Sequence, residues 1–256
     1  MLGVIGGTGL SQMNGFEPAG QERVATPFCK GKIEIDLLQH NGCKLAFLLR
    51  HGKKHETPPH KINYQANIWA LHKLGVDKII AVNAVGGIHK NLGPGCLAVT
   101  IQIFDYTHGR VATYFEENPQ NVMHIDFTYP FTETLRSALL DSANIMNMKS
   151  SSDRLVIDGG VYGCTQGPRL ETTAEVNRYK IEGCDLLGMT AMPEAVLARE
   201  LGIDYALLAL SVNWAAGQFE GEILMEDISE VVERSAEFLI GILQILVEKF
   251  DDQYNS

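Results

Sequence analysis

The sequence has few cysteines, no concentration of positive charge and no long apolar stretch. Its five cysteines form no Cys-x-x-Cys pair, which argues against a disulfide framework or a zinc site and favours reduced thiols in the cytoplasm. Acidic residues outnumber basic ones by 31 to 21, so nucleic acid is not an expected partner. No apolar run approaches the ~18 residues that cross a bilayer, and the N-terminal MLGVIGGTGL has no basic region. We therefore expect neither a membrane span nor a signal peptide.

The composition that remains is typical of a globular protein. The chain has 256 residues, of which 45% are hydrophobic and 20% charged, enough for one sizeable core. We find no repeat, no low-complexity segment and no linker that would divide the chain. We therefore expect a single domain over residues 1–256.

Apolar runs alternate with helical periodicity along the whole chain. Nearly continuous apolar runs predict strands that are buried on both faces, and a spacing of three or four residues predicts helices between them. The expected strands are 2–6, 32–38, 43–49, 77–83, 96–104, 154–158, a short one at 185–187, and 203–212. The expected helices are 61–74, 193–201 and about 227–249. Pro193 and Asp227 suit the first position and the cap of their helices. The alternation predicts an α/β sandwich, with an irregular excursion over 105–131.

Polar residues follow several of the expected strands, at the carboxyl ends where open α/β sheets bind ligands. The segments are Gly6-Gly7-Thr8-Gly9, Arg50-His51-Gly52, Asn83-Ala84 and Asn213-Trp214. Glycine turns expose backbone amides to an anion, and an arginine offers a planar fork to phosphate. Each segment alone also fits an ordinary role, namely a chain reversal, a surface salt bridge or a turn. Together they favour a small-molecule site that contains an anion.

Two further motifs precede helices. Glu171, in the segment Gly167-Pro168-Arg169-Leu170-Glu171, either forms an ion pair with Arg169 or accepts a hydrogen bond from a ligand. Thr190 either caps the helix that follows it or presents its hydroxyl to an anion at the positive helix end.

Other kinds of site lack their signatures. Gln12 stands where a dinucleotide-binding fingerprint needs glycine, and no P-loop, Gly-x-Ser-x-Gly elbow or His-Glu-x-x-His motif occurs. His51, His55 and His60 are close in sequence, but two prolines interrupt them and no carboxylate matches them. We therefore expect no metal site.

The motifs together resemble one family over nearly the whole chain. The string KINYQANIWAL at 61–71 resembles the methylthioadenosine phosphorylase branch of the trimeric purine nucleoside phosphorylase family. The GGTG at 6–9, RHG at 50–52, GPR at 167–169 and MTxxPE pattern at 189–194 resemble it too. The resemblance implies a three-layer α/β/α sandwich with a mixed central sheet. It also implies phosphorolysis of a nucleoside without a metal or organic cofactor, phosphate being a co-substrate, in a homotrimer with shared active sites.

The resemblance also implies roles for single residues. Asn213, His51 and Arg50 are the expected catalytic residues, and Met189 matches the residue that packs against the ribose. The expected phosphate ligands are Thr8, Arg50, His51, Asn83, Ala84 and Thr190, although the methylthioadenosine branch usually has Thr in place of Asn83. The other expected nucleoside contacts are Leu170, Glu171, Asn213, Trp214, Ala215, His60, His124, Met225 and Ile228. Of these, His124 matches a segment that a neighbouring subunit contributes, and Met225 and Ile228 are candidates either for contact with an alkylthio group or for ordinary packing.

The base site departs from the adenine-specific members, which carry aspartates where Asn213 and Ala215 stand and a small polar residue where Glu171 stands. A 6-oxopurine has a donor at N1 and an acceptor at O6, so Glu171 can accept from N1 and Asn213 can donate to O6 or N7. Adenine would present the N1 acceptor to a carboxylate, which is repulsive. The expected base is therefore a 6-oxopurine. The segment 58–64 resembles the methylthio branch of the family, which implies a 5′-methylthio group, so the expected substrate is a 6-oxopurine 5′-methylthionucleoside.

Four alternatives remain open. Within the family they are a phosphorylase of inosine and guanosine and a methylthioadenosine phosphorylase. Outside it they are a nucleotide-binding or NAD-dependent protein, which the failed fingerprint disfavours, and a nucleoside-binding protein without activity.

Overall fold

The computed structural model describes residues 1–8, 10, 12–116 and 123–254, with side chains up to Phe250. Within these residues, eleven strands form one mixed sheet. Eight of them follow one another in the order β2-β3-β4-β1-β5-β10-β9-β7. Outside this path, β11 pairs with β5, β6 pairs with β11, and β8 pairs with β6. The strands are β1 (Leu2–Gly6), β2 (Glu17–Ala25), β3 (Lys32–His40), β4 (Cys43–Leu49), β5 (Lys78–Gly87), β6 (Leu97–Val99), β7 (Gln102–Asp105), β8 (Val156–Asp158), β9 (Val161–Cys164), β10 (Leu186–Gly188) and β11 (Asp204–Trp214). The helices are η1 (Pro59–Lys61), α1 (Tyr64–Lys73), α2 (Glu133–Ser150), α3 (Thr173–Glu182), α4 (Ala191–Glu200) and α5 (Met225–Tyr254).

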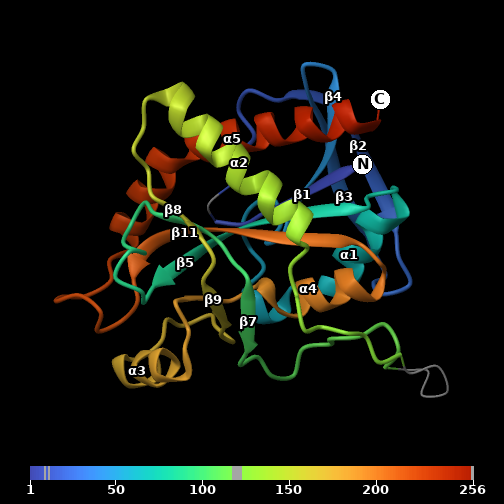
Figure 1. The fold of residues 1–256 in the computed structure, drawn as a ribbon. Helices are drawn as coiled ribbons and strands as arrows, with labels where there is room; N and C mark the ends of the chain where they lie inside the picture. Colours follow the sequence, from blue (N-terminus) through green and yellow to red (C-terminus); the bar gives the residue numbers. More distant parts are fainter. Residues whose placement is uncertain (9, 11, 117–122, 255–256) are drawn as a thin grey trace.

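Successive residues of the central strands enter two different apolar cores. Val4 and Leu208 pack in the core beneath α2 and α5, whereas their neighbours Ile5 and Leu207 pack in the core beneath α1 and α4. This alternation follows from the two-residue period of a strand, and burial on both faces explains why the runs are continuously hydrophobic. Figure 1 shows α2 and α5 on one side of β5 and β11 and α1 and α4 on the other. The structure thus confirms the three-layer α/β/α sandwich with a mixed sheet.

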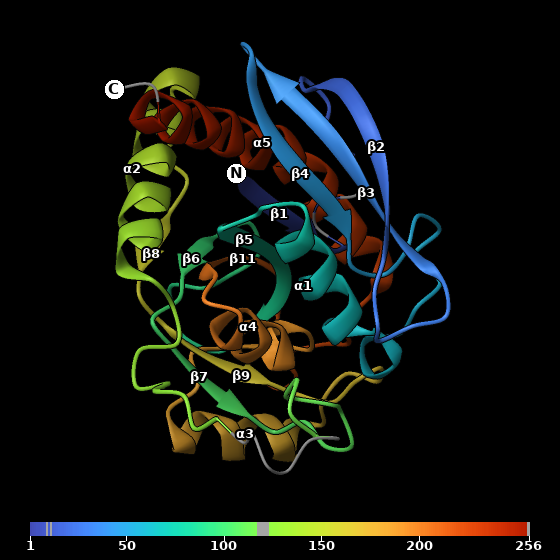
Figure 2. The ribbon, with the colours of Figure 1, turned by 90° about the vertical axis from the view of Figure 1, so that its right-hand side faces the viewer.

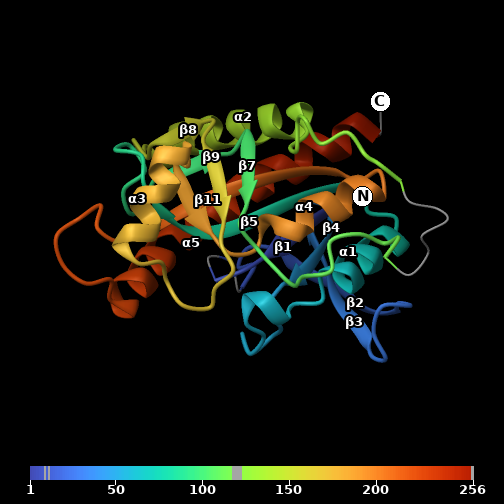
Figure 3. The same ribbon diagram turned by 90° about the horizontal axis from the view of Figure 1, so that it is seen from below.

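The sheet brings the predicted polar segments together at one edge. Strand β1 pairs in parallel with β4 and β5, and β5 pairs in parallel with β11. Their carboxyl ends therefore point to the same edge. The residues that follow Gly6 and Leu49 lie near Val82 and Asn83, and β5 and β11 extend beyond this level to Gly87 and Trp214. In Figures 2 and 3 the sheet curves so that β7 and β9 stand apart from β1 and β4, with α3 beyond them.

Several expected boundaries were wrong. The run 96–104 is two strands, because β6 pairs with β11 and β8 whereas β7 pairs with β9. Helix α1 begins at Tyr64, where the Asn63 side chain accepts a hydrogen bond from the amide of Ala66 and so caps it. Helix α5 begins at Met225, so Asp227 lies in its first turn and is not its cap. In α4 the backbone of Met192 is not helical, so the regular helix begins at Pro193 as expected.

Three strands or α-helices had no counterpart in the prediction: β2, β9 and α2. The short helix η1 was not predicted either, and α3 was expected, without bounds, as a helix after the Gly167–Glu171 motif. Within the described part of the chain, no helix is both long enough and apolar enough to cross a membrane.

Candidate active site

A cavity of about 550 Å³ opens where the parallel strands end. The second half of β5, the loops after β1, β4, β9, β10 and β11, and the start of α5 surround it. Most of the predicted site residues line it: Thr8, Arg50, His51, Asn83, Ala84, Leu170, Glu171, Met189, Thr190, Asn213, Ala215, Met225 and Ile228. The volume is of the size that holds a small organic ligand, roughly 300–1,000 Å³.

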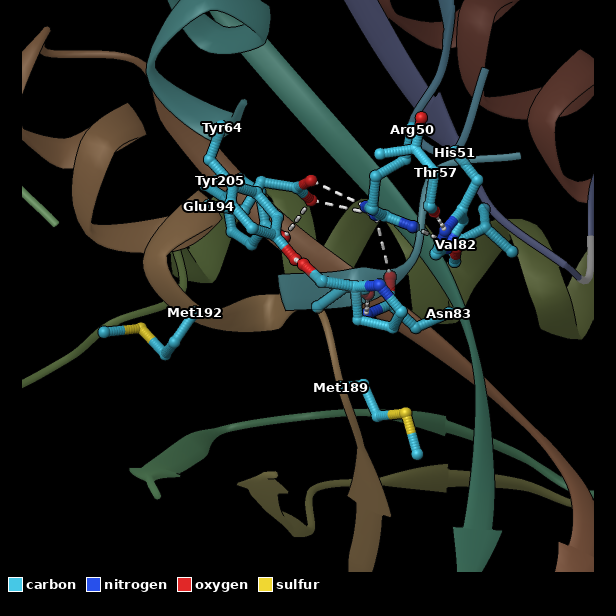
Figure 4. A network of polar contacts seen from close by, with 12 residues as sticks. Arg50, His51, Thr57, Tyr64, Val82, Asn83, Met189, Met192, Glu194 and Tyr205 are labelled. Carbon is cyan, nitrogen blue, oxygen red and sulfur yellow. Dashed lines mark hydrogen bonds and ion pairs between the residues drawn. The ribbon is translucent and has the colours of Figure 1, made fainter. Parts of the chain in front are cut away.

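Arg50 is held at the floor of this cavity by a buried ion pair with Glu194 from α4. Its Nε donates to one carboxylate oxygen at 2.7 Å and its Nη2 to the other at 2.8 Å, and both side chains are about 1% exposed. Burial opposes the charge on Arg50, but the Glu194 carboxylate outweighs it and raises the pKa of the guanidinium above its ordinary value. Tyr205 donates its hydroxyl to the same carboxylate at 2.8 Å. Figure 4 shows the two parallel contacts between Arg50 and Glu194.

The remaining hydrogen-bonding capacity of Arg50 lies at Nη1. Nη2 also donates to Asn83 Oδ1 at 3.0 Å, whereas Nη1 makes only a long contact of 3.4 Å with the carbonyl of Val82. A guanidinium has five N–H donors, so an N–H of Nη1 is available to a ligand. A Cβ atom on Gly7 would lie 2.8 Å from Nη1, which explains why this turn needs glycine. Gly9 of the same motif lies outside the described residues.

Asn83 forms hydrogen bonds with Arg50 and Thr190, two of the expected phosphate ligands. Its Nδ2 donates to Thr190 Oγ1 at 3.0 Å and to the Tyr162 hydroxyl at 3.2 Å, so both amide hydrogens have partners inside the protein. Thr190 occupies the N-cap position of α4, but its side chain forms no capping hydrogen bond. Its hydroxyl proton is therefore free to point into the cavity. The alternative in which Thr190 serves only as a cap is wrong.

His51 enters the cavity as a neutral ring. Its Nδ1 lies 2.8 Å from the carbonyl of Thr57, and since a carbonyl only accepts, Nδ1 carries the proton. Burial, together with the charges of Arg50 and His55, lowers the pKa of His51 to about 4. The neutral ring leaves Nε2 as an acceptor. The ring of His55 stacks on it with centroids 4.3 Å apart, and His55 Nε2 lies 3.3 Å from the Thr8 hydroxyl.

The other end of the cavity presents an acceptor, an amide and an apolar wall. Arg169 bonds Glu175 in the capping box of α3 and not Glu171, so the ion-pair alternative for Glu171 is wrong. A register shift between Ser211 and Asn213 sets Asn213 opposite Gly86, and such a bulge redirects a side chain at the end of a strand. The amide nitrogen of Asn213 donates to the carbonyl of Trp214 at 2.7 Å, which leaves its second hydrogen for a ligand. Ala215 adds no polar side-chain atom.

The sequence comparison decides the family. The family model described as the phosphorylase superfamily matches residues 2–248. The chain belongs to the phosphorylase superfamily.

Individual relatives of this phosphorylase agree with the family. The probable S-methyl-5′-thioinosine phosphorylase of Pseudomonas syringae pv. tomato is 48% identical over 229 residues, which cover 90% of this chain and 91% of that protein. The 6-oxopurine nucleoside phosphorylase of Pyrococcus furiosus is 39% identical over 247 residues, or 94% of this chain and 90% of that protein. Among solved structures, methylthioadenosine phosphorylase from Schistosoma mansoni in complex with adenine has a TM-score of 0.89 at 31% identity, covering 98% of this chain and 92% of that one.

Three predicted residues of the phosphorylase lie outside the main cavity. Trp214 lines a neighbouring cavity, where its ring packs on Gly93. His60 is part of η1 and has a buried Nδ1 without a hydrogen-bond partner in the described residues. His124 is exposed on the loop before α2. The structure of one chain therefore does not bring these three side chains to the ligand cavity.

Other residues of the phosphorylase site had not been predicted. Glu194, Tyr205, Tyr162 and His55 hold Arg50, Asn83 and Thr8 in place. Glu194 stands in the MTxxPE motif, but its partner Arg50 lies 144 positions away in the sequence, so no local pattern shows the pair. His55 was noted only as one of three neighbouring histidines.

Proposed function

We propose that the protein catalyses phosphorolysis of S-methyl-5′-thioinosine to hypoxanthine and 5-methylthioribose 1-phosphate. The observation that carries this proposal is the set of polar groups that line one cavity. Arg50 and Thr190 supply donors for an anion, and Glu171 and Asn213 supply an acceptor and an amide for a purine base. The names of the relatives, which include 6-oxopurine and methylthioinosine phosphorylases, support the same chemistry.

The two ends of the cavity divide the reaction between them. Phosphate, held by Arg50 Nη1, the hydroxyls of Thr8 and Thr190 and the ring of His51, attacks C1′ of the nucleoside. The bond from C1′ to N9 breaks, its electron pair goes to the purine, and the purine takes up a proton on release. Asn213 donates to N7 or O6 and so stabilises the negative charge as it develops. The charge of the phosphate stabilises the cationic sugar.

The Arg50 and Glu194 pair affects how the anion is recognised. Because the Glu194 carboxylate compensates the charge of Arg50, the pair brings no net positive charge to the cavity. Phosphate recognition then depends on directed donors, namely Arg50 Nη1 and the hydroxyls of Thr8 and Thr190. The gathered groups serve an anion, so we propose phosphate as co-substrate and no metal or organic cofactor.

The 5′ end of the cavity favours a methylthio group over a hydroxyl. We assign to this end the apolar residues Ile223, Met225 and Ile228 at and before the start of α5, together with prolines 58 and 59, all of which line the cavity. A 5′-hydroxyl would gain no side-chain partner from these residues, whereas an alkylthio group buries apolar surface. The alternative substrate is inosine or guanosine, which shares the base site. Methylthioadenosine is the other alternative, which Glu171 and Ala215 disfavour.

We further propose a homotrimer that acts in the cytoplasm. Large apolar side chains, Phe104, Met123 and Tyr129, are between 41% and 73% exposed on the segment that also carries His124. A neighbouring subunit that covers this segment would bury them and bring His124 to a second active site. None of the five cysteines, which all lie in the described part of the chain, forms a disulfide, and this suits a reducing compartment.

The test measures the release of the purine base from methylthioinosine, inosine and methylthioadenosine, each with and without phosphate. Methylthioinosine should be cleaved fastest and only with phosphate, and the sugar product should be 5-methylthioribose 1-phosphate. Faster cleavage of inosine would retain the base site and refute the 5′ assignment. Cleavage that does not need phosphate would refute phosphorolysis.

A further inference from the structure

Thr165 is a buried residue that none of the preceding roles requires. It follows β9 and is 5% exposed, and its amide donates to the carbonyl of Gly188 at 2.8 Å. Its hydroxyl donates to Oε1 of Glu171 at 2.6 Å. The hydroxyl oxygen also lies 3.4 Å from the Gly188 carbonyl, but one proton serves one acceptor, and the shorter contact to a carboxylate is the stronger.

This contact decides how Glu171 meets a ligand. The last torsion of a glutamate is broad, so a carboxylate without a partner rotates freely. In the described residues, Thr165 is the one side chain that hydrogen-bonds Glu171. It fixes Oε1 and leaves Oε2 as an acceptor at the wall of the cavity.

The backbone of Thr165 is held by hydrogen bonds from Arg110. Arg110, from the loop after β7, donates through Nη2 to the carbonyls of Thr165 at 3.4 Å and Gln166 at 2.9 Å. The Gln166 side chain accepts from Arg110 Nε and exchanges two hydrogen bonds with the backbone of His108. The hydroxyl of Thr165 is therefore presented to Glu171 from a rigid position.

We propose that Thr165 is a positioning residue for base specificity, which acts by aiming Glu171 at the N1–H of a 6-oxopurine. The inference rests on the proposed function, because it concerns the base that the same cavity binds. Without the hydroxyl, the Glu171 carboxylate rotates among several orientations. Its oxygen is then no longer held where it accepts a hydrogen bond from N1–H of a 6-oxopurine and repels the N1 lone pair of adenine. Selectivity for 6-oxopurine nucleosides then falls, whereas phosphate binding does not change, because the Thr165 hydroxyl bonds Glu171 and none of the phosphate ligands.

The experiment uses Thr165→Val, which keeps the shape and removes the hydroxyl, and Thr165→Ser, which keeps the hydroxyl, as its matched control. The measured quantity is the ratio of kcat/KM for methylthioinosine to that for methylthioadenosine. Thr165→Val should lower this ratio roughly tenfold to a hundredfold, the usual effect of losing a hydrogen bond to a charged group. Thr165→Ser should keep it near the wild-type ratio, and KM for phosphate should be the same in all three proteins.

A double-mutant cycle separates this role from general loosening of the loop. If Thr165 acts through Glu171, adding Thr165→Val to Glu171→Gln should change the ratio by less than about twofold. The inference is overturned if Thr165→Val lowers the ratio of kcat/KM values equally in the wild-type and the Glu171→Gln protein. It is also overturned if Thr165→Val alone leaves the ratio unchanged. If the valine variant does not fold, Thr165→Ala takes its place in the same cycle. A wild-type protein that cleaves no 6-oxopurine nucleoside refutes the proposed function itself.

Discussion

Arg50 and His51 are adjacent in the chain, yet their surroundings give them opposite charge states. Glu194 keeps Arg50 charged, whereas burial and the neighbouring cations lower the pKa of His51 to about 4 and keep it neutral. A neutral His51 with its proton on Nδ1 offers Nε2 to a protonated oxygen of phosphate. The anion end therefore contains both donors and an acceptor, which suits a phosphate that carries one or two protons.

The lowered pKa of His51 makes stability depend on pH. In the unfolded chain this histidine binds a proton near its ordinary pKa of 6.5, but in the folded protein only near 4, so protons favour unfolding between these values. The contribution of His51 is complete above about pH 6.5 and is lost as the pH falls towards 4. From pH 7 to pH 5 it should remove about 2 kcal/mol from the free energy of unfolding, measured by urea denaturation.

The matched variants for this prediction are His51→Asn and His72→Asn. Asn at 51 keeps a donor for the carbonyl of Thr57 but does not titrate, so this part of the pH dependence should disappear. His72 is exposed at the end of α1, and its replacement should leave the dependence as in the wild type. Equal slopes for all three proteins would show that His51 is not the group responsible.

Asn213 should set the choice of base together with Glu171. Asn213→Asp replaces an amide donor by a carboxylate, which can accept from the 6-amino group of adenine and repels O6 of hypoxanthine. The ratio of kcat/KM for methylthioadenosine to that for methylthioinosine should rise at least about tenfold. Asn213→Ala, which only removes the donor, should slow both substrates. An unchanged base preference in Asn213→Asp would refute the assignment of this residue.

At the level of residues, the sequence predicts polar side chains that follow apolar runs, but it does not predict their hydrogen-bond partners. Arg50 and Asn213 could be predicted because each comes at the end of a hydrophobic strand. Glu194 and Thr165 could not, since their roles arise from contacts with Arg50 and Glu171 that depend on how β4, β9 and α4 are arranged.

Between elements, Arg110 is the main connection among the loops of the site. It donates to the Tyr64 hydroxyl and to the carbonyls of Met189 and Met192, and it also bonds residues 165 and 166. Its guanidinium lies 5.6 Å from the centre of the Tyr64 ring. One side chain from the long loop after β7 thus joins α1, the loop after β9 and the start of α4.

Replacing Arg110 by Lys should therefore destabilise the protein although the charge is kept. A lysine ammonium cannot span carbonyls that face a planar fork from several directions, so buried acceptors lose their donors. We expect a loss of about 3 kcal/mol in the free energy of unfolding by chemical denaturation. Arg23→Lys is the control, because Arg23 pairs with Glu34 at the surface and its loss should cost little. Equal effects of the two substitutions would contradict the role of Arg110.

The elements that escaped prediction did so for different physical reasons. Strand β2 is the edge of the sheet and is mostly exposed, so its sequence EPAGQERVA has no apolar run. Helix α2, in contrast, carried a usable signal, because Leu135, Leu139 and Ala143 recur every four residues and are all buried. Strand β9 has only four residues, too few for a period to show. The excursion before α2 is irregular where it is described.

On the scale of the whole molecule, the proposed role of His124 in the active site of a neighbouring subunit requires an oligomer. Sedimentation should give a particle of about three times the chain mass of 28.2 kDa. His124→Ala should then raise KM for the nucleoside without changing the mass of the particle, because the residue would serve a neighbouring cavity. A monomer that is fully active would refute both the trimer and the shared site.

The central claim is that this cavity selects a 6-oxopurine carried on a 5-methylthioribose. Its most direct test is competition: equal concentrations of methylthioinosine and methylthioadenosine react with the enzyme and excess phosphate in one vessel. The initial rates at which hypoxanthine and adenine appear give the ratio of the two kcat/KM values directly. Hypoxanthine should appear first and in large excess. If adenine appears as fast or faster, Glu171 and Asn213 do not read the base as the geometry indicates.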